Sequence, residues 1–273
     1  MKKAIKKIGW FFKLCWMCLS MGWRGYVNYM GWSALVHGIG LVIGYLGEYL
    51  VLFTMITNFP GIGGFTALEV CFLYAISLVT YALGNFHTRM FWKIDSLVQR
   101  GELDQYLVRP VSPLMQLLVW DLQVGYISHV ILGIGSMMLV YGMLGLSWGI
   151  DKWITLALTI MSGTLVMGGI SLVGTPIVFW WGKSSAVTRF LRSVLRSTIR
   201  YPMSAYPEAV QRALFVIPYA FVSYIPCLYL FDKPGSYSSF MTVAVCFAAG
   251  IAINFVFWVF WRMGLRRYNS AGG

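Results

Sequence analysis

Apolar residues run along this chain in long blocks, and shorter segments rich in basic residues separate the blocks. A helix needs about 20 apolar residues to cross the hydrocarbon core of a bilayer. Blocks of that kind lie at Tyr29 to Ile56, Phe65 to Phe86, Leu114 to Tyr141, Trp153 to Trp181 and Phe240 to Trp261. Each of them predicts a transmembrane helix. Gly40 and Gly44 in the first block form a G-x-x-x-G pair, which favours close packing against another helix.

A sixth apolar stretch, Ala213 to Phe231, is less regular because it contains Pro218 and Pro226. A spanning helix tolerates proline only where neighbouring groups or water satisfy the freed backbone groups. The preceding stretch, residues 183–212, carries arginines spaced three or four residues apart, so that they share one helix face. These arginines are Arg189, Arg192, Arg196 and Arg200.

Two arrangements of this region are open. In the first, residues 183–212 form an amphipathic helix on the anionic cytoplasmic surface of the membrane, and residues 213–231 are the fifth crossing. In the second, residues 183–205 cross the membrane with their arginines facing a polar cavity, and the proline-bearing segment dips into the outer leaflet and returns. The cost of placing arginines inside a bilayer favours the first arrangement.

The basic residues fall almost entirely on one side of the predicted crossings. If the N-terminus is cytoplasmic and six crossings alternate, Lys152 and Lys233 are the only two of the 21 Lys and Arg residues that lie outside. The positive-inside rule therefore predicts that both termini are cytoplasmic. Residues 1–28, with a basic start and several aromatic side chains, fit a helix that lies in the cytoplasmic interface.

The composition agrees with a membrane protein. The chain is 59% hydrophobic and 11% charged, whereas a soluble domain has about 25% charged residues. We therefore expect residues 1–273 to form a single membrane domain, and membrane orientation explains the net charge of +12 better than nucleic-acid binding does. The five cysteines are scattered, and His37, His87 and His129 lack the spacing of paired ligands, so no metal site is expected.

Residues 88–113 form the long connection that mixes both charge signs. Ile94, Leu97 and Val98 repeat at helical spacing until Gly101 breaks the pattern. A solvated loop would explain this segment, and so would a short amphipathic helix that docks on a soluble motor. The residues alone leave both interpretations open.

Two stretches of sequence resemble a known family. GELDQYLVRPVSP, from Gly101 to Pro113, resembles the G-x-L-D-x-x-L-x-R-P-x-[ST]-P signature of bacterial ABC-2 type transporter permeases. YPMSAYPEAVQRALFVIPYAFVSYIP, from Tyr201 to Pro226, is similar to the tyrosine- and proline-rich region of the same family. The two motifs occur in the family's order, and the resemblance covers nearly the whole chain.

The resemblance implies an all-α integral membrane protein with six transmembrane helices, an N-terminal interfacial helix and a cytoplasmic coupling helix, as in ABC-2 or type V exporters. It implies a separate ABC ATPase subunit that binds ATP and Mg²⁺, so that this chain is not an enzyme and binds no cofactor directly. A second permease copy or a paralogue would complete the pathway, among the lipids of the bacterial cell membrane. It also implies a re-entrant segment before the last crossing, which favours the second arrangement.

The candidate residues fall into two sets. By resemblance, the residues that contact the ATPase are Ile94, Leu97, Gly101, Glu102, Leu103, Asp104, Arg109 and Pro110. Ionisable residues in apolar surroundings are candidates for the translocation pathway, because burying them is costly. They are Glu48, Glu69, Asp121, Arg189, Arg192, Arg196 and Arg200. Contact with lipid head groups is the alternative for Glu48 and Glu69, and a pairing with the basic 88–113 segment is the alternative for Asp121.

We therefore expect the transmembrane permease of an ATP-binding-cassette exporter, which moves a drug, peptide or lipid-like substrate out of the cell by alternating access. A multipass membrane enzyme would need catalytic groups that converge at one depth. An ion-coupled secondary transporter would need paired carboxylates near the membrane midplane and repeat symmetry. Neither pattern is evident in the sequence.

Overall fold

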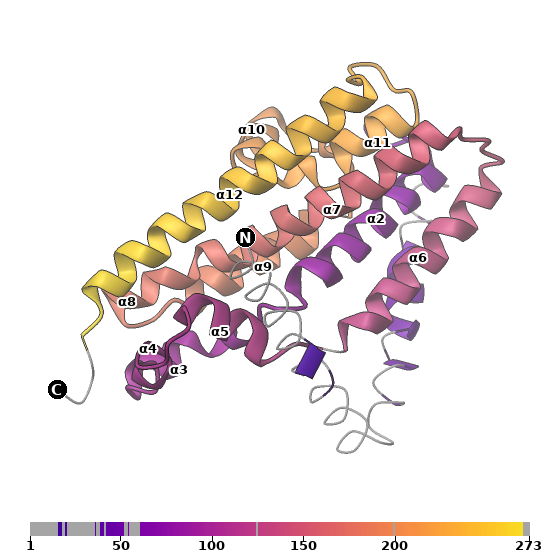
Figure 1. The fold of residues 1–273 in the computed structure, drawn as a ribbon. Helices are drawn as coiled ribbons and strands as arrows, with labels where there is room; N and C mark the ends of the chain where they lie inside the picture. The colour runs from indigo at the N-terminus through magenta and orange to yellow at the C-terminus, as the bar shows by residue number, and fades with distance from the viewer. Residues whose placement is uncertain are drawn as a thin grey trace, which may run out of the picture.

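The computed structural model describes residues 16, 17, 20, 36, 39, 40, 42–51, 54, 61–123, 125–198 and 200–269. Within these residues the secondary structure is helical, apart from one isolated β-bridge between Ile62 and Phe65. Figure 1 shows the long helices side by side in an elongated bundle. The predicted all-helical architecture is therefore confirmed for the described part of the chain. The predicted interfacial helix at residues 1–28 falls almost entirely outside it.

Within the described residues, four helical stretches are long and apolar enough to cross a membrane. They are α2 (Ala67–Asn85), α6 (Tyr126–Met143), the stretch Ile150–Trp181 and α12 (Ser239–Arg267). The stretch Ile150–Trp181 comprises α7 (Ile150–Val173), η2 (Thr175–Ile177) and α8 (Val178–Trp181). The helix Val42–Val51 lies within the first predicted crossing, of which residues 36, 39, 40 and 54 are also described.

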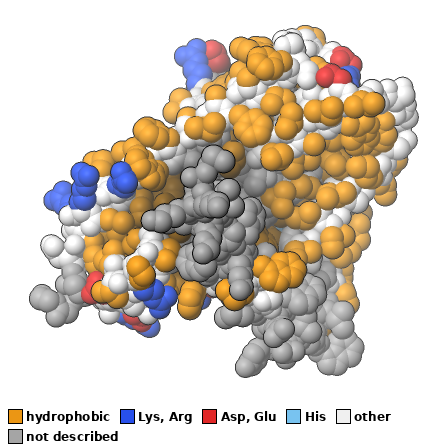
Figure 2. Space-filling view, in the orientation of Figure 1, with side chains coloured by type: hydrophobic (Ala, Val, Ile, Leu, Met, Phe, Trp, Pro, Cys, Tyr) orange, Lys and Arg blue, Asp and Glu red, His pale blue; other side chains and the backbone are white. Residues whose placement is uncertain are grey.

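Helix α7 lies at the centre of the bundle, because it packs against α2 on one side and α12 on the other, while α6 packs against α2. Most of α2 is buried, whereas only a small share of α6 and of α12 is. On the face drawn in Figure 2, hydrophobic side chains predominate on the described surface between the ends of the bundle, and charged side chains gather toward those ends. This distribution fits a multi-pass membrane protein, whose middle faces lipid.

The third predicted crossing begins later than the apolar block suggests. The block Leu114 to Tyr141 is divided into α5 (Pro113–Trp120) and α6, and the chain between them is not helical. Leu117 of α5 is fully buried in a cluster with Phe257 and Trp261 of α12. The apolar residues at the start of the block are thus explained by packing against protein, and the span itself starts at Tyr126.

Residues 88–113 lie at one end of the bundle and are built from three short helices. These are η1 (Arg89–Lys93), α3 (Ile94–Gln99) and α4 (Asp104–Leu107). We call this end of the bundle the Asp95 end, and the opposite end, where α2 begins, the Glu69 end. In Figure 1 the Asp95 end is at the lower left and the loop between α6 and α7 marks the Glu69 end.

The arginine-rich helix α9 (Ser185–Thr198) extends from the Asp95 end toward the Glu69 end. At its start, Ser184 and Ser185 contact Asp95. Beyond its last residue, Ser204 Oγ donates a hydrogen bond of 2.7 Å to the carbonyl oxygen of Gly63, just before α2. Since α2 has 19 residues and is therefore about 28 Å long, residues 185–204 pass along most of the bundle.

The proline-bearing segment enters and leaves the bundle at the Glu69 end. It contains α10 (Glu208–Val216), η4 (Tyr219–Phe221) and α11 (Tyr224–Leu230), and its two halves are bent by 77°. Its deepest part reaches the middle of α2, where Ser77 Oγ donates to Ser223 Oγ at 2.8 Å. After α11, Lys233 Nζ lies 2.8 Å from Glu69 Oε2 in the first turn of α2. The segment is therefore re-entrant.

Residues 183–205 thus run along the bundle and residues 207–231 return to the end at which they entered, which is the course of the chain that the second predicted arrangement describes. The physical reason for the bend is Pro218, since the residue before a proline is forced out of the helical region. Ile217 accordingly has an extended backbone, with φ −90° and ψ 100°, and α10 ends there.

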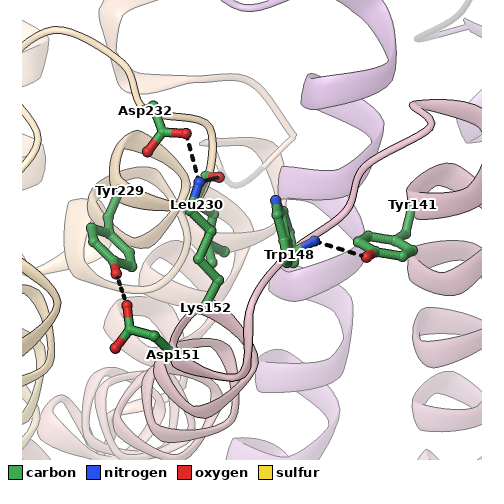
Figure 3. A network of polar contacts seen from close by, with 7 residues as sticks. All are labelled: Tyr141, Trp148, Asp151, Lys152, Tyr229, Leu230 and Asp232. Carbon is green, nitrogen blue, oxygen red and sulfur yellow. Dashed lines mark hydrogen bonds and ion pairs between the residues drawn. The ribbon is translucent and has the colours of Figure 1, made fainter.

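Polar contacts hold the returning segment at the Glu69 end (Figure 3). Lys152 Nζ donates to the carbonyl oxygen of Leu230 at 3.0 Å and pairs with Asp232 at 2.6 Å. Nearby, Tyr229 donates a hydrogen bond to Asp151, and the backbone N–H of Trp148 donates to Tyr141 Oη at 3.2 Å. Both basic residues that were predicted to lie outside, Lys152 and Lys233, are therefore paired with a carboxylate.

Glycines allow the central helices to approach closely. A Cβ added to Gly84 of α2 would lie 2.7 Å from Met167 Cβ and 2.8 Å from the backbone N of Gly168 in α7. By contrast, Gly40 and Gly44 have nothing within 4 Å of an added Cβ. The close packing that the G-x-x-x-G pair predicts is therefore absent from the described part of this chain, and Gly84 provides it elsewhere.

We expect Gly84→Leu to lower stability by about 1–3 kcal/mol, because the new side chain would force α2 and α7 apart. Gly135→Leu is the matched control, since Gly135 lies in the mostly exposed α6 with open space beside it. Thermal unfolding of the purified protein in detergent measures both. Equal melting temperatures for the two variants would contradict the packing argument.

Candidate functional site

The 88–113 segment forms a compact unit with one side packed on the bundle. Gly101 adopts φ +70°, which lets the chain turn sharply between α3 and α4. The backbone N–H of Leu103 donates to the carbonyl oxygen of Leu97 at 3.1 Å across this turn. The segment is therefore a folded element with its own turn rather than an irregular loop.

Burial divides the residues that were predicted to contact an ATPase into two groups. Ile94, Leu97 and Leu103 are buried in the cluster that also contains Phe257 and Trp261 of α12. These three side chains therefore hold the segment on the bundle and are not available to a partner. Glu102, Arg109 and Pro110 are exposed, and Gly101 and Asp104 are half-buried.

The exposed side of the segment also includes two apolar residues that were not among those predicted to contact an ATPase. Leu107 is 41% exposed and Val108 is 83% exposed, on either side of the C-terminal end of α4. Arg109 is held in place by aromatic rings, with its guanidinium 5.6 Å from the ring centroid of Tyr106 and 5.3 Å from that of Trp120. An apolar side chain next to a fixed cation is suited to contact with another protein.

Asp95 joins the 88–113 segment to α9. Its Oδ1 accepts hydrogen bonds from the backbone N–H of Ser184 at 2.8 Å and from Ser184 Oγ at 2.6 Å, and its Oδ2 accepts from the N–H of Ser185 at 2.9 Å. The carboxylate thus caps the helix from another part of the chain, where it also interacts favourably with the helix dipole. Although partial burial opposes it, the hydrogen bonds from Ser184 and Ser185 hold the pKa of Asp95 below its usual value.

Two further contacts join the 88–113 segment to α9 and to the turn before it. Gln99 Nε2 donates to the carbonyl oxygen of Gly182, the residue that ends α8, at 2.7 Å. The guanidinium of Arg192 in α9 lies 4.5 Å from the ring centroid of Trp92 in η1. Movement of the 88–113 segment would therefore be transmitted to α9 at several points.

Asp121 pairs with the basic residues of the 88–113 segment. Its Oδ2 lies 3.5 Å from both Arg89 Nε and Lys93 Nζ. This position confirms the alternative that was considered for Asp121, and it lies where α5 ends and the chain turns toward α6. Asp121 is therefore an interhelical anchor at the Asp95 end.

At its other end, α9 is followed by an ion pair with the first crossing. Arg200 Nη2 lies 2.7 Å from Glu48 Oε1, and both side chains are largely shielded from solvent. The hydroxyl of Tyr74 in α2 donates a hydrogen bond to the second carboxylate oxygen of Glu48. Two of the predicted pathway residues are thus brought together, although 151 residues separate them in sequence.

Glu69 has a structural role. It is the third residue of a capping box in which its Oε2 accepts from the backbone N–H of Thr66 at 2.7 Å, and it also pairs with Lys233. Arg189 and Arg192 lie on α9, where Arg189 is exposed and Arg192 is half-buried. The side chain of Arg196 lies outside the described part of the chain.

The polar side chains described above connect segments that are distant in sequence. Among the described residues, no group of three or more His, Cys, Asp or Glu side chains is placed to hold a metal ion. Four of the acids, Asp95, Asp121, Glu48 and Glu69, each contact a helix terminus or a basic side chain. What the site contains is a polar helix, α9, held by the Asp95 carboxylate at one end and by the Glu48 carboxylate near the other.

Sequence reasoning missed Asp95 because it occurs in a mixed-charge stretch with no feature that marks it as a cap. The signal that could have revealed it lies elsewhere in the chain, in Ser184 and Ser185 before the arginine-rich helix, since serine is typical of a helix N-terminus. Even so, Asp95, which accepts from those backbone N–H groups, lies 89 positions before Ser184 in the sequence. Only the tertiary structure brings them together.

The chain was compared with known proteins. A family model described as "ABC-2 family transporter protein" matches residues 42–272. No curated protein and no solved structure matches the chain.

We expect Asp95→Ala to destabilise the protein by about 0.5–2 kcal/mol, because the N–H groups at the start of α9 lose their cap. Since the folded-state pKa of Asp95 is depressed, its contribution is present at neutral pH and is lost as the pH falls through the usual carboxyl range toward that lower value. The difference in melting temperature from wild type should therefore shrink in acid. Glu102→Ala is the control, because its pair with Arg100 is exposed. A difference that does not depend on pH would contradict the capping role.

We expect Glu48→Gln and Arg200→Gln each to destabilise the protein by about 1–3 kcal/mol, since each leaves a shielded charge without its partner. The double variant should recover part of that loss. A double-mutant cycle on melting temperature measures the coupling, with Arg212→Gln as the control because its pair with Glu208 is exposed. Additive losses in the cycle would show that the Glu48–Arg200 pair does not couple the two segments.

Proposed function

The chain belongs to the ABC-2 family transporter proteins, and from this membership we propose that it is the permease subunit of an ATP-driven exporter. As a member of this family it is a membrane subunit for transport and not an enzyme. We propose that a separate ATPase binds and hydrolyses ATP with Mg²⁺, that two permease subunits form the pathway, and that the substrate leaves the cell.

The main support for this proposal is that the 88–113 segment has one buried side and one exposed side. Its inner side is packed on the bundle, with Ile94, Leu97 and Leu103 in the buried cluster that also contains Phe257 and Trp261 of α12. Its outer side presents Val108 and Arg109 to a partner. An element that is firmly attached on one side and open on the other is suited to receive force from a motor protein.

The mechanism follows from the contacts of α9. Binding of ATP by the partner would move the 88–113 segment, and the cap from Asp95 would carry that movement to the start of α9. Helix α9 is followed by Arg200, which holds Glu48 of the first crossing. A shift of α9 would therefore change the position of the first crossing relative to α2, and so alter access to the pathway at the Glu69 end. Each nucleotide state would stabilise one of two arrangements.

We propose that the Asp95 end and both termini lie on the cytoplasmic side of the bacterial cell membrane. Basic residues of the 88–113 segment and of the C-terminal end of α12, Arg266 and Arg267, support that orientation. Six crossings would result from the first crossing, α2, α6, the stretch Ile150–Trp181, residues 183–205 and α12. The re-entrant segment would then lie in the outer leaflet.

We expect Val108→Glu to weaken ATPase binding by about tenfold or more, because it introduces a charge into an apolar contact. Val108 is 83% exposed, so the fold should tolerate the change. Arg109→Glu should have the same effect by reversing the fixed charge. Co-purification with the ATPase and transport-coupled ATP hydrolysis measure both.

Val210→Glu is the matched control, because Val210 is also exposed but lies on α10 in the re-entrant segment. Asp95→Ala should differ from both by retaining ATPase binding while losing coupling. Full binding and coupling in the Val108 and Arg109 variants would contradict the docking role of this surface.

A further inference from the structure

Two arginines on α9 have no carboxylate partner in the part of the chain that the structure describes. The ion pairs found there involve other basic residues, and neither Arg189 nor Arg192 takes part in them. Each instead donates from Nε to a backbone carbonyl of its own helix, Arg189 to Ser185 at 3.0 Å and Arg192 to Thr188 at 3.1 Å. The charge of each guanidinium is therefore not balanced by a described acid.

Arg192 lies on α9 where side chains of other elements gather. Its guanidinium lies 4.5 Å from the ring centroid of Trp92 in η1. Tyr81 of α2 packs on the same buried cluster as Val194 of α9, which places this tyrosine beside the helix. The ring of Tyr81 packs edge to face on that of Tyr126 in α6, with 5.9 Å between the ring centroids. Segments that are distant in sequence thus meet beside α9.

This constellation has the chemistry of an anion site. A planar guanidinium donates paired hydrogen bonds to phosphate or carboxylate oxygens, and tyrosine hydroxyls add neutral donors. Stacking on Trp92 fixes the guanidinium plane, which reduces the entropy lost when an anion binds. A half-buried arginine in a membrane protein is costly unless a counter-charge is supplied. An anionic ligand would supply it.

The position of the site indicates what kind of anion fits. Tyr126 is the first residue of α6, and Trp92 follows α2 at the Asp95 end of the bundle. Lipid head groups lie at the level where the spans end. Exposed apolar side chains occur on both helices that contribute to the site, Ile127 on α6 at 41% and Phe190 on α9 at 65%. A phosphate group of a membrane lipid would therefore lie at the level of Arg192.

We propose that Arg192, Trp92, Tyr81 and Tyr126 form a binding site for the phosphate-bearing head group of an amphipathic ligand, with Arg189 adding to the positive field. The inference rests on these contacts and not on the proposed coupling to an ATPase. Phosphate chemistry is shared by membrane phospholipids and by free phosphate esters, so the experiment separates these sources.

The test measures lipid binding to the purified full-length protein by native mass spectrometry. Phosphatidylglycerol, which is anionic, is compared with phosphatidylcholine, which carries no net charge. We expect wild type to prefer phosphatidylglycerol, and Arg192→Gln to bind it about tenfold more weakly, since a charge-assisted contact is lost. Arg262→Gln is the matched control, because Arg262 lies 4.3 Å over the ring of Trp258 on α12 and has the same kind of stacking. Its preference should stay at the wild-type level.

A second variant keeps the test valid if Arg192→Gln does not fold. Tyr126→Phe retains the ring and its packing but removes the hydroxyl, and it should weaken phosphatidylglycerol binding several-fold. Equal binding of the two lipids to wild type would overturn the proposal, and so would equal losses in the Arg192 and Arg262 variants, because general charge attraction would then suffice.

Competition identifies the source of the phosphate group. Glycerol 3-phosphate that displaces phosphatidylglycerol from wild type, but has no effect on Arg192→Gln, assigns the site to a phosphate ester without a tail. Failure of glycerol 3-phosphate to compete, with the lipid preference intact, assigns it to a phospholipid whose acyl chains contribute to binding. Both results retain Arg192 as the group that recognises the phosphate.

Discussion

The structure depends on how one polar helix, α9, is held among apolar helices. Helix α9 carries arginines on one face, so it cannot be held in the bundle by hydrophobic packing alone. Carboxylates from other segments hold it, with Asp95 at its first N–H groups and Glu48 at Arg200 beyond its last turn. Because one carboxylate belongs to the 88–113 segment and the other to the first crossing, the same contacts that place α9 also connect the two ends of the bundle.

The second consequence concerns the proline-bearing segment. Once residues 185–204 pass along α2, the chain is already at the Glu69 end when it reaches Pro207. The bend at Pro218 turns it back, and Lys233 and Asp232 bind it at the end from which it started. The return therefore follows from the course of α9 and from one residue that cannot continue a helix.

Particular residues show why some predictions were right and others were not. Asp121 was considered as a partner of the basic segment, and it pairs with Arg89 and Lys93 of that segment. Ile94 and Leu97 were taken as contacts for a partner, yet they are buried, because an amphipathic pattern identifies an apolar face without saying what covers it. Gly40 and Gly44 matched a packing motif that Gly84 fulfils instead, since close approach depends on which helices cross and not on the motif.

The sequence by itself determined the membrane class, the helical content, the family and the division into a basic end and an opposite end. These properties follow from the length of apolar blocks and from the distribution of charge, which are local and additive. Only the tertiary structure decided that Leu117 packs on protein, that α9 passes along the bundle, and that Asp95 caps it. Those outcomes depend on contacts between residues far apart in the chain, and hydropathy cannot distinguish a side chain covered by lipid from one covered by another helix.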